Sequence, residues 1–398
     1  MSLPLLDQVT TSISRLTDLI EPVVVETNSI DQCAGRVLAQ PLVADRDNPP
    51  IDVSAMDGFA IRLADLCGEP LNVVGTAAAG SPPVELHPRT AVRIFTGGPV
   101  PTAAEAVVRC EDTDATSNQV RFRVKPNELL FGQNIRRRGE NIRSGQTLLS
   151  KGTLLSAAPM SAIATFGPAV LSVFSRVRVS ILNTGDELVS PGQPAQPWQI
   201  RDSNGPVLET LLSQQSWIDV IHRQSVGDKL PNLVSSLNEQ LAISDAVMLT
   251  GGVSMGDFDF VPEAILQCGG KIIFHRLPIK PGKPILGAIG PNGQLIVGLP
   301  GNPVSVAVTA RRFALPMLRR RGGLLNPATE MFSIVLQNPD TTILDLIWYR
   351  LVKLLGDGKG ELLDSRGSGD LVSLTLSDGF IEVPAGQSGV GPWKYYSW

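Results

Sequence analysis

The feature that most constrains the fold is an alternation of strand-like and helix-like segments between residues 175 and 321. The first segment places Val177, Val179 and Ile181 at every second position between polar residues, the period of a strand with one buried face. Further predicted elements are strands over 219–226 and 245–250 and helices over 204–216, 229–241 and 260–268. Such alternation is typical of a doubly wound, mostly parallel sheet with helices on both faces.

The remainder of the chain predicts a multidomain protein of α/β plus β type. A length of 398 residues is too great for one ordinary core and favours two to four domains. The predicted domains are a discontinuous N-terminal helical linking layer (1–50 and 136–174), a β-rich inserted domain (51–135), the α/β domain (175–325) and a C-terminal β-barrel-like domain (326–398).

Local patterns predict the elements of these flanking domains. An apolar stripe at spacings of three and four predicts an N-terminal amphipathic helix that ends near Pro22. The stripe consists of Leu6, Val9, Ile13, Leu16 and Ile20. Further helices are predicted around 31–40 and 156–165, and a strand over 371–376. Two prolines and several Asp and Asn residues predict irregular structure over 45–61.

Composition excludes several classes of function. A net charge of −4, with 18% charged residues, argues against nucleic acid as a general partner, because nucleic-acid-binding surfaces are usually basic. The sequence has no apolar run of the ~18 residues that span a bilayer, and no signal peptide. We therefore expect a cytoplasmic protein with no membrane partner.

Cysteine and histidine usage narrows the available chemistry further. The cysteines are scattered without CxxC spacing and are interpreted as reduced thiols. They are Cys33, Cys67, Cys110 and Cys268. With only 3 histidines, Ser–His catalysis and a His-ligated zinc have little support. The histidines are His87, His222 and His275. Carboxylates, lysines and a hard metal ion are the remaining tools.

Three unusual loops follow predicted strands of the α/β domain. In such sheets ligands bind outside the carboxyl ends of the strands. The loops are "NTGDEL" with Asp186 and Glu187, "TGGVSMGDFD" with Gly251, Gly252, Ser254, Asp257 and Asp259, and "LPGNPVS" with Asn302 and Pro303. Asn302 is a predicted helix N-cap and Pro303 a predicted first-turn residue, so the third loop predicts an anion site at a helix N-terminus.

The charges of these loops predict an anion that is held partly through a cation. Lys280 and Lys283 lie in the stiff loop "IKPGKP" and can bind an anion at a low entropic cost. Asp257 and Asp259 would repel each other by roughly 3 kcal/mol at a separation of about 5 Å. A bound Mg²⁺ would remove that repulsion and bridge to phosphate oxygens. The expected ligand is phosphorylated or carries a pyrophosphate.

Seven motifs in order carry a resemblance to a known family. They are "SAMDGFA", "TGGPVP", "GQNIRRRGENI", "NTGDEL", "TGGVSMGDFD", "KPGKP" and "LPGNPVS". Together they resemble the molybdopterin molybdenumtransferases, the MoeA family, to which the E domains of gephyrin and its plant counterpart belong. The resemblance extends over almost the whole chain.

The resemblance implies an activity, cofactors and partners. It implies insertion of molybdenum from molybdate into adenylylated molybdopterin (molybdopterin-AMP), with Mg²⁺-dependent release of AMP and formation of molybdenum cofactor. It also implies a homodimer, with molybdopterin adenylyltransferase and molybdoenzymes as further partners. Each cleft of the family's dimer joins two subunits.

The resemblance also implies roles for individual residues. The catalytic set is Asp57, Thr96, Glu187, Asp228 and Asp259. The substrate-binding set is Gly251, Gly252, Ser254, Lys280, Lys283, Pro300, Pro303, Arg350 and Ser368. The metal-binding set is Asp257, Asp259 and Glu187. Two positions depart from the family pattern: Asn141 stands where Asp is common, and Phe59 stands where Tyr is usual.

Two alternatives remain open beside the insertase. A molybdopterin adenylyltransferase would share the glycine and lysine loops, but it lacks the β-rich insert and the C-terminal domain. A non-catalytic molybdopterin-binding or scaffold protein is favoured by the lost charge at Asn141. Retention of the acidic and lysine residues of the loops argues against a scaffold. These residues are Glu187, Asp257, Asp259, Lys280 and Lys283.

Overall fold

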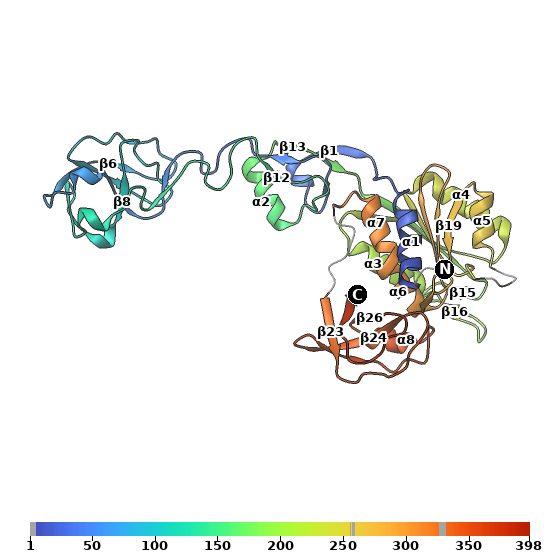
Figure 1. The fold of residues 1–398 in the computed structure, drawn as a ribbon. Coiled ribbons are helices and arrows are strands. Elements are labelled where there is room, and N and C mark those ends of the chain that lie inside the picture. The colour runs from blue at the N-terminus through green and yellow to red at the C-terminus, as the bar shows by residue number, and fades with distance from the viewer. Residues whose placement is uncertain (1–4, 255, 257–258, 326–331) are drawn as a thin grey trace. The chain divides into compact units, whose positions relative to one another are not determined.

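A computed structural model describes residues 5–254, 256, 259–325 and 332–398 (Figure 1). The chain forms two compact units. Unit 1 comprises Met1–Gln40, Ser150–Met160 and Ala169–Trp398, and unit 2 comprises Pro41–Leu149 and Ser161–Pro168. The finer division into four domains stays a prediction. Among the described helices, none is both long and apolar enough to cross a membrane.

Unit 1 contains the predicted mostly parallel sheet. It has six strands in the order β17-β14-β18-β22-β21-β19. Their bounds are β14 (Val177–Thr184), β17 (Ile218–Val226), β18 (Ala246–Thr250), β19 (Lys271–His275), β21 (Leu286–Ile289) and β22 (Leu295–Leu299). The first four strands in this order run parallel, and β21 and β19 are antiparallel additions. The carboxyl ends of the parallel strands therefore meet at one edge of the sheet.

Helices cover both faces of this sheet, as predicted (Figure 1). Their bounds are α3 (Asn204–Ser213), α4 (Leu230–Ile243), α5 (Val261–Gln267), α6 (Pro303–Thr309) and α7 (Leu315–Arg321), with a π-helical segment over Ala310–Ala314. The adjacent residues Ile181 and Leu182 of β14 are both fully buried, one in the core with α3 and α6 and the other in the core with α4 and α5. Burial of both faces explains the apolar strands.

Of the three helices predicted outside the α/β domain, two form and one does not. The amphipathic segment forms α1 (Leu5–Thr17), and α2 (Ala157–Phe166) matches the predicted helix around 156–165. The helix predicted around 31–40 is wrong, because Gly35 adopts a left-handed backbone (φ 75°) and residues 37–38 join a sheet. That sheet contains β1 (Val25–Ser29), β2 (Val37–Leu38) and β13 (Val170–Phe174).

The C-terminal part of unit 1 is a closed β barrel, which confirms the barrel-like prediction. The bounds are β20 (Ile279–Lys280), β23 (Phe332–Leu336), β24 (Ile347–Gly356), β25 (Lys359–Leu362), β26 (Gly379–Val383) and β27 (Trp393–Ser397). Pairing of β24 with β26 closes the ring, and β20 adds to β24.

The strand predicted over 371–376 is wrong. It forms α8 (Leu371–Leu376), because the Asp370 carboxylate accepts hydrogen bonds from the Val372 and Ser373 N–H groups and caps a helix.

Unit 2 is β-rich, as predicted for the insert. Its main sheet has six strands in the order β8-β5-β7-β6-β10-β9. Their bounds are β5 (Gly58–Ile61), β6 (Leu71–Ala77), β7 (Thr90–Ile94), β8 (Ala106–Arg109), β9 (Thr113–Ala115) and β10 (Gln119–Phe122). Two short pairs complete it: β3 (Leu42–Val43) with β12 (Thr147–Leu149), and β4 (Val53–Ser54) with β11 (Ile135–Arg136).

The irregular structure predicted over 45–61 is wrong for its second half. Strand β5 pairs with both β7 and β8, and its Phe59 and Ile61 side chains are buried in the core. Burial of these apolar side chains outweighs the turn-forming tendency of the neighbouring Asp and Gly residues.

Candidate active site

One pocket lies at the carboxyl ends of the parallel strands, as the topology predicts. Its volume is about 370 Å³, and we call it the carboxylate pocket. The loop after each of the strands β14, β17, β18 and β22 contributes to it, together with the short pair β15 (Leu188–Val189) and β16 (Ile200–Arg201). The predicted residues that line it are Glu187, Asp228, Gly251, Gly252, Asp259 and Pro303.

Like charges concentrate around Asp228 in this pocket. Burial raises the pKa of the Asp228 carboxyl, a hydrogen bond from the Asp186 N–H opposes that shift, and the negative charges of Asp186, Glu187 and Asp259 add to it. The Asp228 N–H in turn donates to the Asp186 carboxylate at 3.0 Å. This end of the site therefore repels anions and favours a cation, a proton or a hydrogen-bond donor.

The double glycine gives the pocket its shape. Gly251 and Gly252 have φ values of 80° and 59°, the left-handed region that glycine occupies without strain. A Cβ at Gly251 would also lie 2.7 Å from the Thr184 carbonyl oxygen. The Gly251 N–H donates to the Leu299 carbonyl at 3.1 Å and is not free to bind an anion. Gly251 therefore provides space and not a backbone donor.

A second, cationic pocket adjoins the first one. Its volume is about 540 Å³, and we call it the lysine pocket. The predicted residues that line it are Lys280, Lys283, Pro300, Arg350 and Ser368. Asn302 lines both pockets, so one ligand can extend from the first into the second. The lysine pocket lies between the α/β sheet and the barrel, because Arg350 and Ser368 belong to the C-terminal part of the chain.

Cations in the lysine pocket are arranged around Trp348. The Lys280 Nζ lies 4.9 Å, and the Arg350 guanidinium carbon 4.1 Å, from the centroid of the Trp348 ring. Arg350 also donates to the Asp340 carboxylate at 2.5 Å. Within the described part of the chain, Lys280 and Lys283 form no ion pair. Their charges are available to an anionic ligand.

Ser368 connects the barrel to the start of α6. The Asn302 side-chain amide donates to the Ser368 hydroxyl at 2.8 Å, and the Val304 N–H donates to the Ser368 carbonyl at 3.0 Å. Asn302 occupies the N-cap position of α6, as predicted, but its side chain accepts no hydrogen bond from the helix. The predicted N-cap position is therefore confirmed, although the Asn302 side chain bonds to Ser368 and not to the helix.

Asp57 and Thr96 belong to unit 2, where the structure brings them together. Both are exposed, and the Asp57 carboxylate accepts hydrogen bonds from the Thr96 N–H at 2.7 Å and the Thr96 hydroxyl at 2.8 Å. These bonds lower the pKa of Asp57. The other predicted residues that the structure describes lie in unit 1. Ser254 is exposed and lines neither pocket, and Asp257 lies outside the described residues.

The metal-binding prediction is supported only by the type of donor. Carboxylate oxygens suit Mg²⁺, and the pocket provides them at Glu187 and Asp259. Within residues 5–254, 256, 259–325 and 332–398, no three His, Cys, Asp or Glu side chains converge on one point. Asp257 lies outside these ranges.

A buried hydrogen-bond network behind the carboxylate pocket was not predicted from the sequence. The Asn183 amide donates to the Asp202 carboxylate at 2.8 Å, and its carbonyl oxygen accepts from the Thr250 hydroxyl at 2.8 Å. Asp202 also accepts from the Gly205 N–H at 2.9 Å. The network joins the ends of β14 and β18 to the start of α3. The polar residues Asn183 and Thr250 near the ends of two buried strands were the sequence signal that could have indicated this network.

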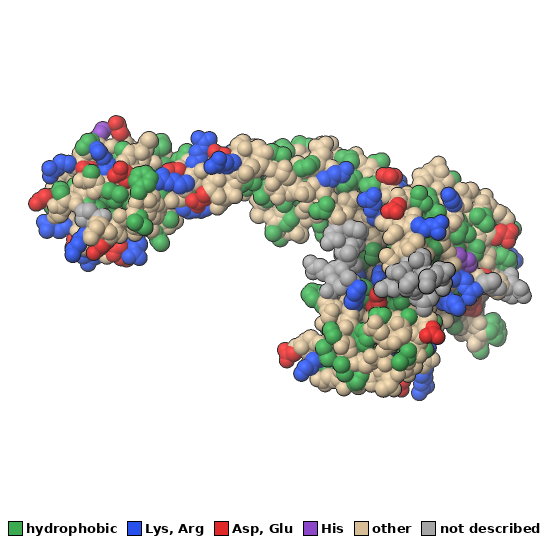
Figure 2. Space-filling view, viewed as in Figure 1, with side chains coloured by type: hydrophobic (Ala, Val, Ile, Leu, Met, Phe, Trp, Pro, Cys, Tyr) green, Lys and Arg blue, Asp and Glu red, His purple; other side chains and the backbone are tan. Residues whose placement is uncertain are grey.

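Asn141 makes its own contacts in unit 2. Its amide nitrogen donates to the Asn48 side-chain oxygen at 2.7 Å, and its oxygen accepts from Arg136 at 3.1 Å. Figure 2 shows basic and acidic side chains interspersed on the visible face of this unit. Arg136 pairs with Glu140 at 2.5 Å, and Arg137 pairs with Asp52 at 2.6 Å.

Replacing Asn141 by Asp should leave the free energy of unfolding within about 0.5 kcal/mol of the wild type. Arg136 would gain a charged acceptor, and the Asn48 amide can turn to donate. Urea unfolding of the two proteins provides the measurement. Asp52→Asn is the matched control, because it weakens bonds from Arg137 and from the Arg138 N–H, and it should destabilise more. A loss above 1 kcal/mol in Asn141→Asp would contradict the expected tolerance.

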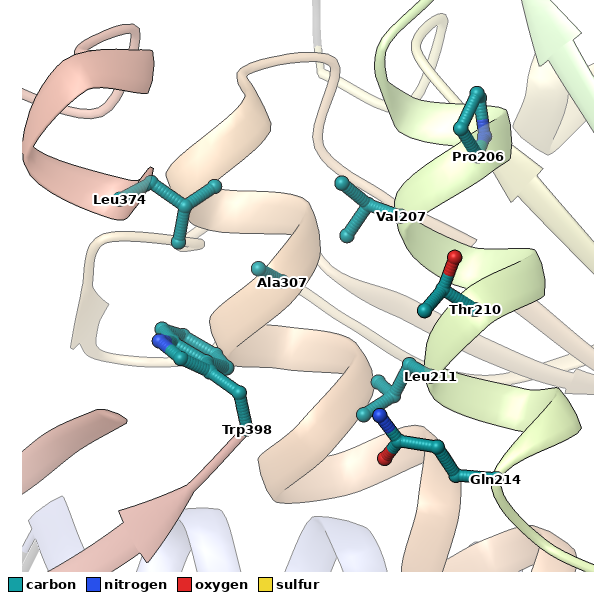
Figure 3. A pocket seen from close by; sticks show the side chains of 8 residues that line it. All are labelled: Pro206, Val207, Thr210, Leu211, Gln214, Ala307, Leu374 and Trp398. Atoms are coloured by element: carbon teal, nitrogen blue, oxygen red, sulfur yellow. The ribbon is translucent and has the colours of Figure 1, made fainter. Parts of the chain in front are cut away.

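A third pocket, of about 310 Å³, contains none of the predicted residues. Figure 3 shows its lining from α3, α6, α8 and the C-terminal residue. The lining side chains carry no charge and are Pro206, Val207, Thr210, Leu211, Gln214, Ala307, Leu374 and Trp398. It is therefore not the candidate site.

Comparisons with known proteins identify the class. The MoeA N-terminal region (domain I and II) matches residues 6–167, and a probable molybdopterin binding domain matches residues 180–320. The two matched domains are those of a multidomain protein of molybdenum cofactor biosynthesis.

Curated relatives give the family. A molybdopterin molybdenumtransferase from Nostoc is 34% identical, with 93% of this chain and 87% of the relative covered. One from Synechococcus elongatus is 35% identical, with 92% of each covered. A crystal structure of a molybdopterin biosynthesis MoeA protein from Pyrococcus horikoshii shares the fold, with a TM-score of 0.82, 24% identity and full coverage of both chains. The chain belongs to the molybdopterin molybdenumtransferase (MoeA) family. This membership makes it a transferase, as the sequence motifs predicted.

Proposed function

We propose that this transferase inserts molybdenum from molybdate into adenylylated molybdopterin and releases AMP in the presence of Mg²⁺. The observation that carries the proposal is the pair of adjoining pockets of opposite charge that share Asn302. A ligand with a pyrophosphate bridge and a second oxyanion needs cationic groups at one end. Binding of a divalent metal needs acidic groups close by. The names of the curated relatives support the same activity.

The described residues suit distinct tasks in this reaction. Lys280, Lys283 and Arg350 offer cations to molybdate or to phosphate oxygens. Ser368 adds a hydroxyl and, through Asn302, couples the two pockets. Asp228 has a raised pKa, and a carboxyl of that kind can hold or transfer a proton at a pH at which ordinary aspartates are ionised.

We also propose that Mg²⁺ binds in the carboxylate pocket as a cofactor. Glu187, Asp259 and Asp257 are the proposed ligands, and the ion would supply charge neutralisation at phosphate oxygens. Like charges around Asp228 support this assignment, because a cation would relieve their repulsion. Asp57 and Thr96, a bonded and exposed pair, are proposed as further functional residues. The homodimer, the cytoplasmic location and the partner proteins are part of the same proposal.

The test is AMP release from molybdopterin-adenylate, with and without molybdate, at saturating Mg²⁺. We expect release that depends on both molybdate and Mg²⁺. Release without molybdate would contradict the insertase. Tight binding with no release would favour the non-catalytic scaffold, the second candidate. Asn141 is the observation behind that candidate, and Asn141→Asp would then be tested for recovery of release.

A further inference from the structure

Two buried polar atoms in the wall of the carboxylate pocket have no hydrogen-bond partner in the described structure. They are the Thr184 hydroxyl oxygen and the Asn204 side-chain carbonyl oxygen. Thr184 and Asn204 are only 7% and 8% exposed, and both line the pocket. A buried polar atom without a partner destabilises a fold unless a ligand or water satisfies it. Neither Thr184 nor Asn204 is among the functional residues that the sequence predicted.

The orientation of each group is fixed by the protein. The Asn204 amide nitrogen donates to the Gly301 carbonyl at 2.7 Å, so the carbonyl end of the amide is the free end. The Thr184 hydroxyl faces the double glycine, where a Cβ at Gly251 or Gly252 would lie 2.8 or 3.0 Å from it. Because glycine has no Cβ, no side chain from either position presses on the hydroxyl.

The surroundings decide what chemistry these two atoms can recognise. The same pocket contains Glu187, Asp228 and Asp259, and a carboxylate group accepts but does not donate when it is ionised. The Asn204 oxygen accepts as well. Arg201 also lines the pocket, and its guanidinium donates to the Gln193 carbonyl at 2.8 Å. The three carboxylates outnumber this cation, so an anionic group on the ligand is disfavoured at this wall. Uncharged N–H or O–H groups fit it, and the neighbouring lysine pocket is left for the anionic part of the ligand.

We propose that Thr184 and Asn204 are substrate-binding residues that hydrogen-bond uncharged N–H or O–H groups of the ligand. This inference rests on the proposed function, in which the ligand is molybdopterin-adenylate. Two parts of that molecule carry such donors: the pterin ring, with its amino and ring N–H groups, and the nucleoside of AMP, with its ribose hydroxyls and adenine amino group. The Asn204 oxygen accepts one of these donors, and the Thr184 hydroxyl completes the contact.

Thr184→Val provides the sharpest test, because valine keeps the shape of threonine and its preference for a strand. The hydroxyl has no partner in the described protein, so the free variant should melt at the wild-type temperature or above it. Its Kd for molybdopterin-adenylate should rise about tenfold. Thr250→Val is the matched control. Its hydroxyl donates to Asn183 inside the protein, so the same substitution should lower the melting temperature.

Asn204→Leu gives a second, independent measurement and separates the two sources of donors. Kd is measured by calorimetry for molybdopterin-adenylate, for molybdopterin and for AMP, on wild type and variant. Weaker binding of the adenylate and of molybdopterin, with AMP unchanged, places the donor on the pterin. Weaker binding of the adenylate and of AMP, with molybdopterin unchanged, places it on the nucleoside. Equal loss for all three, with a lower melting temperature, would show only a structural role for Asn204 and overturn its assignment.

The outcome can be distinguished from failure of the proposed function. If the wild type binds molybdopterin-adenylate without releasing AMP, the insertase fails, but the comparison of Kd values still tests Thr184 and Asn204. If both variants bind like the wild type, this inference is overturned whatever the rate of AMP release. A Thr184→Val variant that melts well below the wild type would also overturn it, because the hydroxyl would then serve the fold.

Discussion

Replacing Glu382 by Ala should lower the free energy of unfolding by about 3 kcal/mol, measured by urea denaturation. Glu382 is 4% exposed and pairs with Arg312 at 2.7 Å, and it also accepts from the Tyr396 hydroxyl at 2.9 Å. Burial alone would lower the pKa of Arg312, but Tyr349, Glu382 and Tyr396 outweigh it and keep that pKa above its ordinary value. Removing Glu382 leaves a largely buried cation without its partner.

Glu209→Ala is the matched control for this experiment. Glu209 pairs with Arg223 at 2.6 Å, nearly the same distance, but the two side chains are 46% and 33% exposed. A solvent-exposed pair of this kind contributes about 1 kcal/mol or less. We therefore expect Glu382→Ala to cost at least three times as much as Glu209→Ala. Equal losses would mean that burial of the Arg312–Glu382 pair does not matter.

The Arg312–Glu382 pair also bears on the lysine pocket. Arg312 lies in the π-helical segment that continues α6, and Glu382 lies on β26, opposite Tyr349 of β24. Arg350, the next residue of β24, lines the lysine pocket. The pair thus holds β26, the neighbour of the strand that presents Arg350, against the helix that follows Asn302. The Arg312–Glu382 pair therefore connects the stability of the barrel to the geometry of the lysine pocket.

The sequence predicted the carboxylate pocket well because the parallel sheet carries most of the information. Apolar strands and intervening helices can be read from local patterns, and topology then places Glu187 and Asp259 at the same edge. The N-terminal helix and the β-rich insert were likewise visible in the pattern.

Contacts between distant residues could not be predicted in that way. Asn302 and Ser368 are 66 positions apart, and no local pattern indicates that the Asn302 side chain would bond to Ser368. The network of Asn183, Asp202 and Thr250 has the same character, because each residue alone resembles an ordinary loop or strand residue. The helix at 371–376 depends on one capping carboxylate, whereas its apolar residues are equally typical of a strand.

The second large effect is expected for Asp228→Asn. AMP release should slow about 100-fold, the lower end of what a group that transfers protons contributes. The same variant should be more stable than the wild type at neutral pH. Burial and the charges of its neighbours raise the pKa of Asp228, so ionisation of this carboxyl opposes folding. Asparagine keeps an oxygen that can accept from the Asp186 N–H and removes the charge.

The dependence of stability on pH distinguishes this effect of charge from a change in side-chain packing around position 228. Below pH 3.8, the ordinary value for Asp, the carboxyl is protonated in both states and the two proteins should be equally stable. As pH rises past 3.8 the unfolded wild type ionises first and is favoured, so the advantage of Asp228→Asn grows until the folded carboxyl has ionised too.

Asp340→Asn should behave in the opposite way. Hydrogen bonds from Thr342, and then from Arg350, lower the pKa of Asp340 to about 2, so its ionisation favours folding. Asp340→Asn should therefore be less stable than the wild type above pH 3.8, with the difference vanishing as pH falls towards about 2. Thermal melts of the three proteins across this range provide the measurement.

A stability advantage of Asp228→Asn that does not change with pH would show that the neighbouring carboxylates do not act on Asp228 as charges. The electrostatic argument for a cation in the carboxylate pocket would then lose its basis.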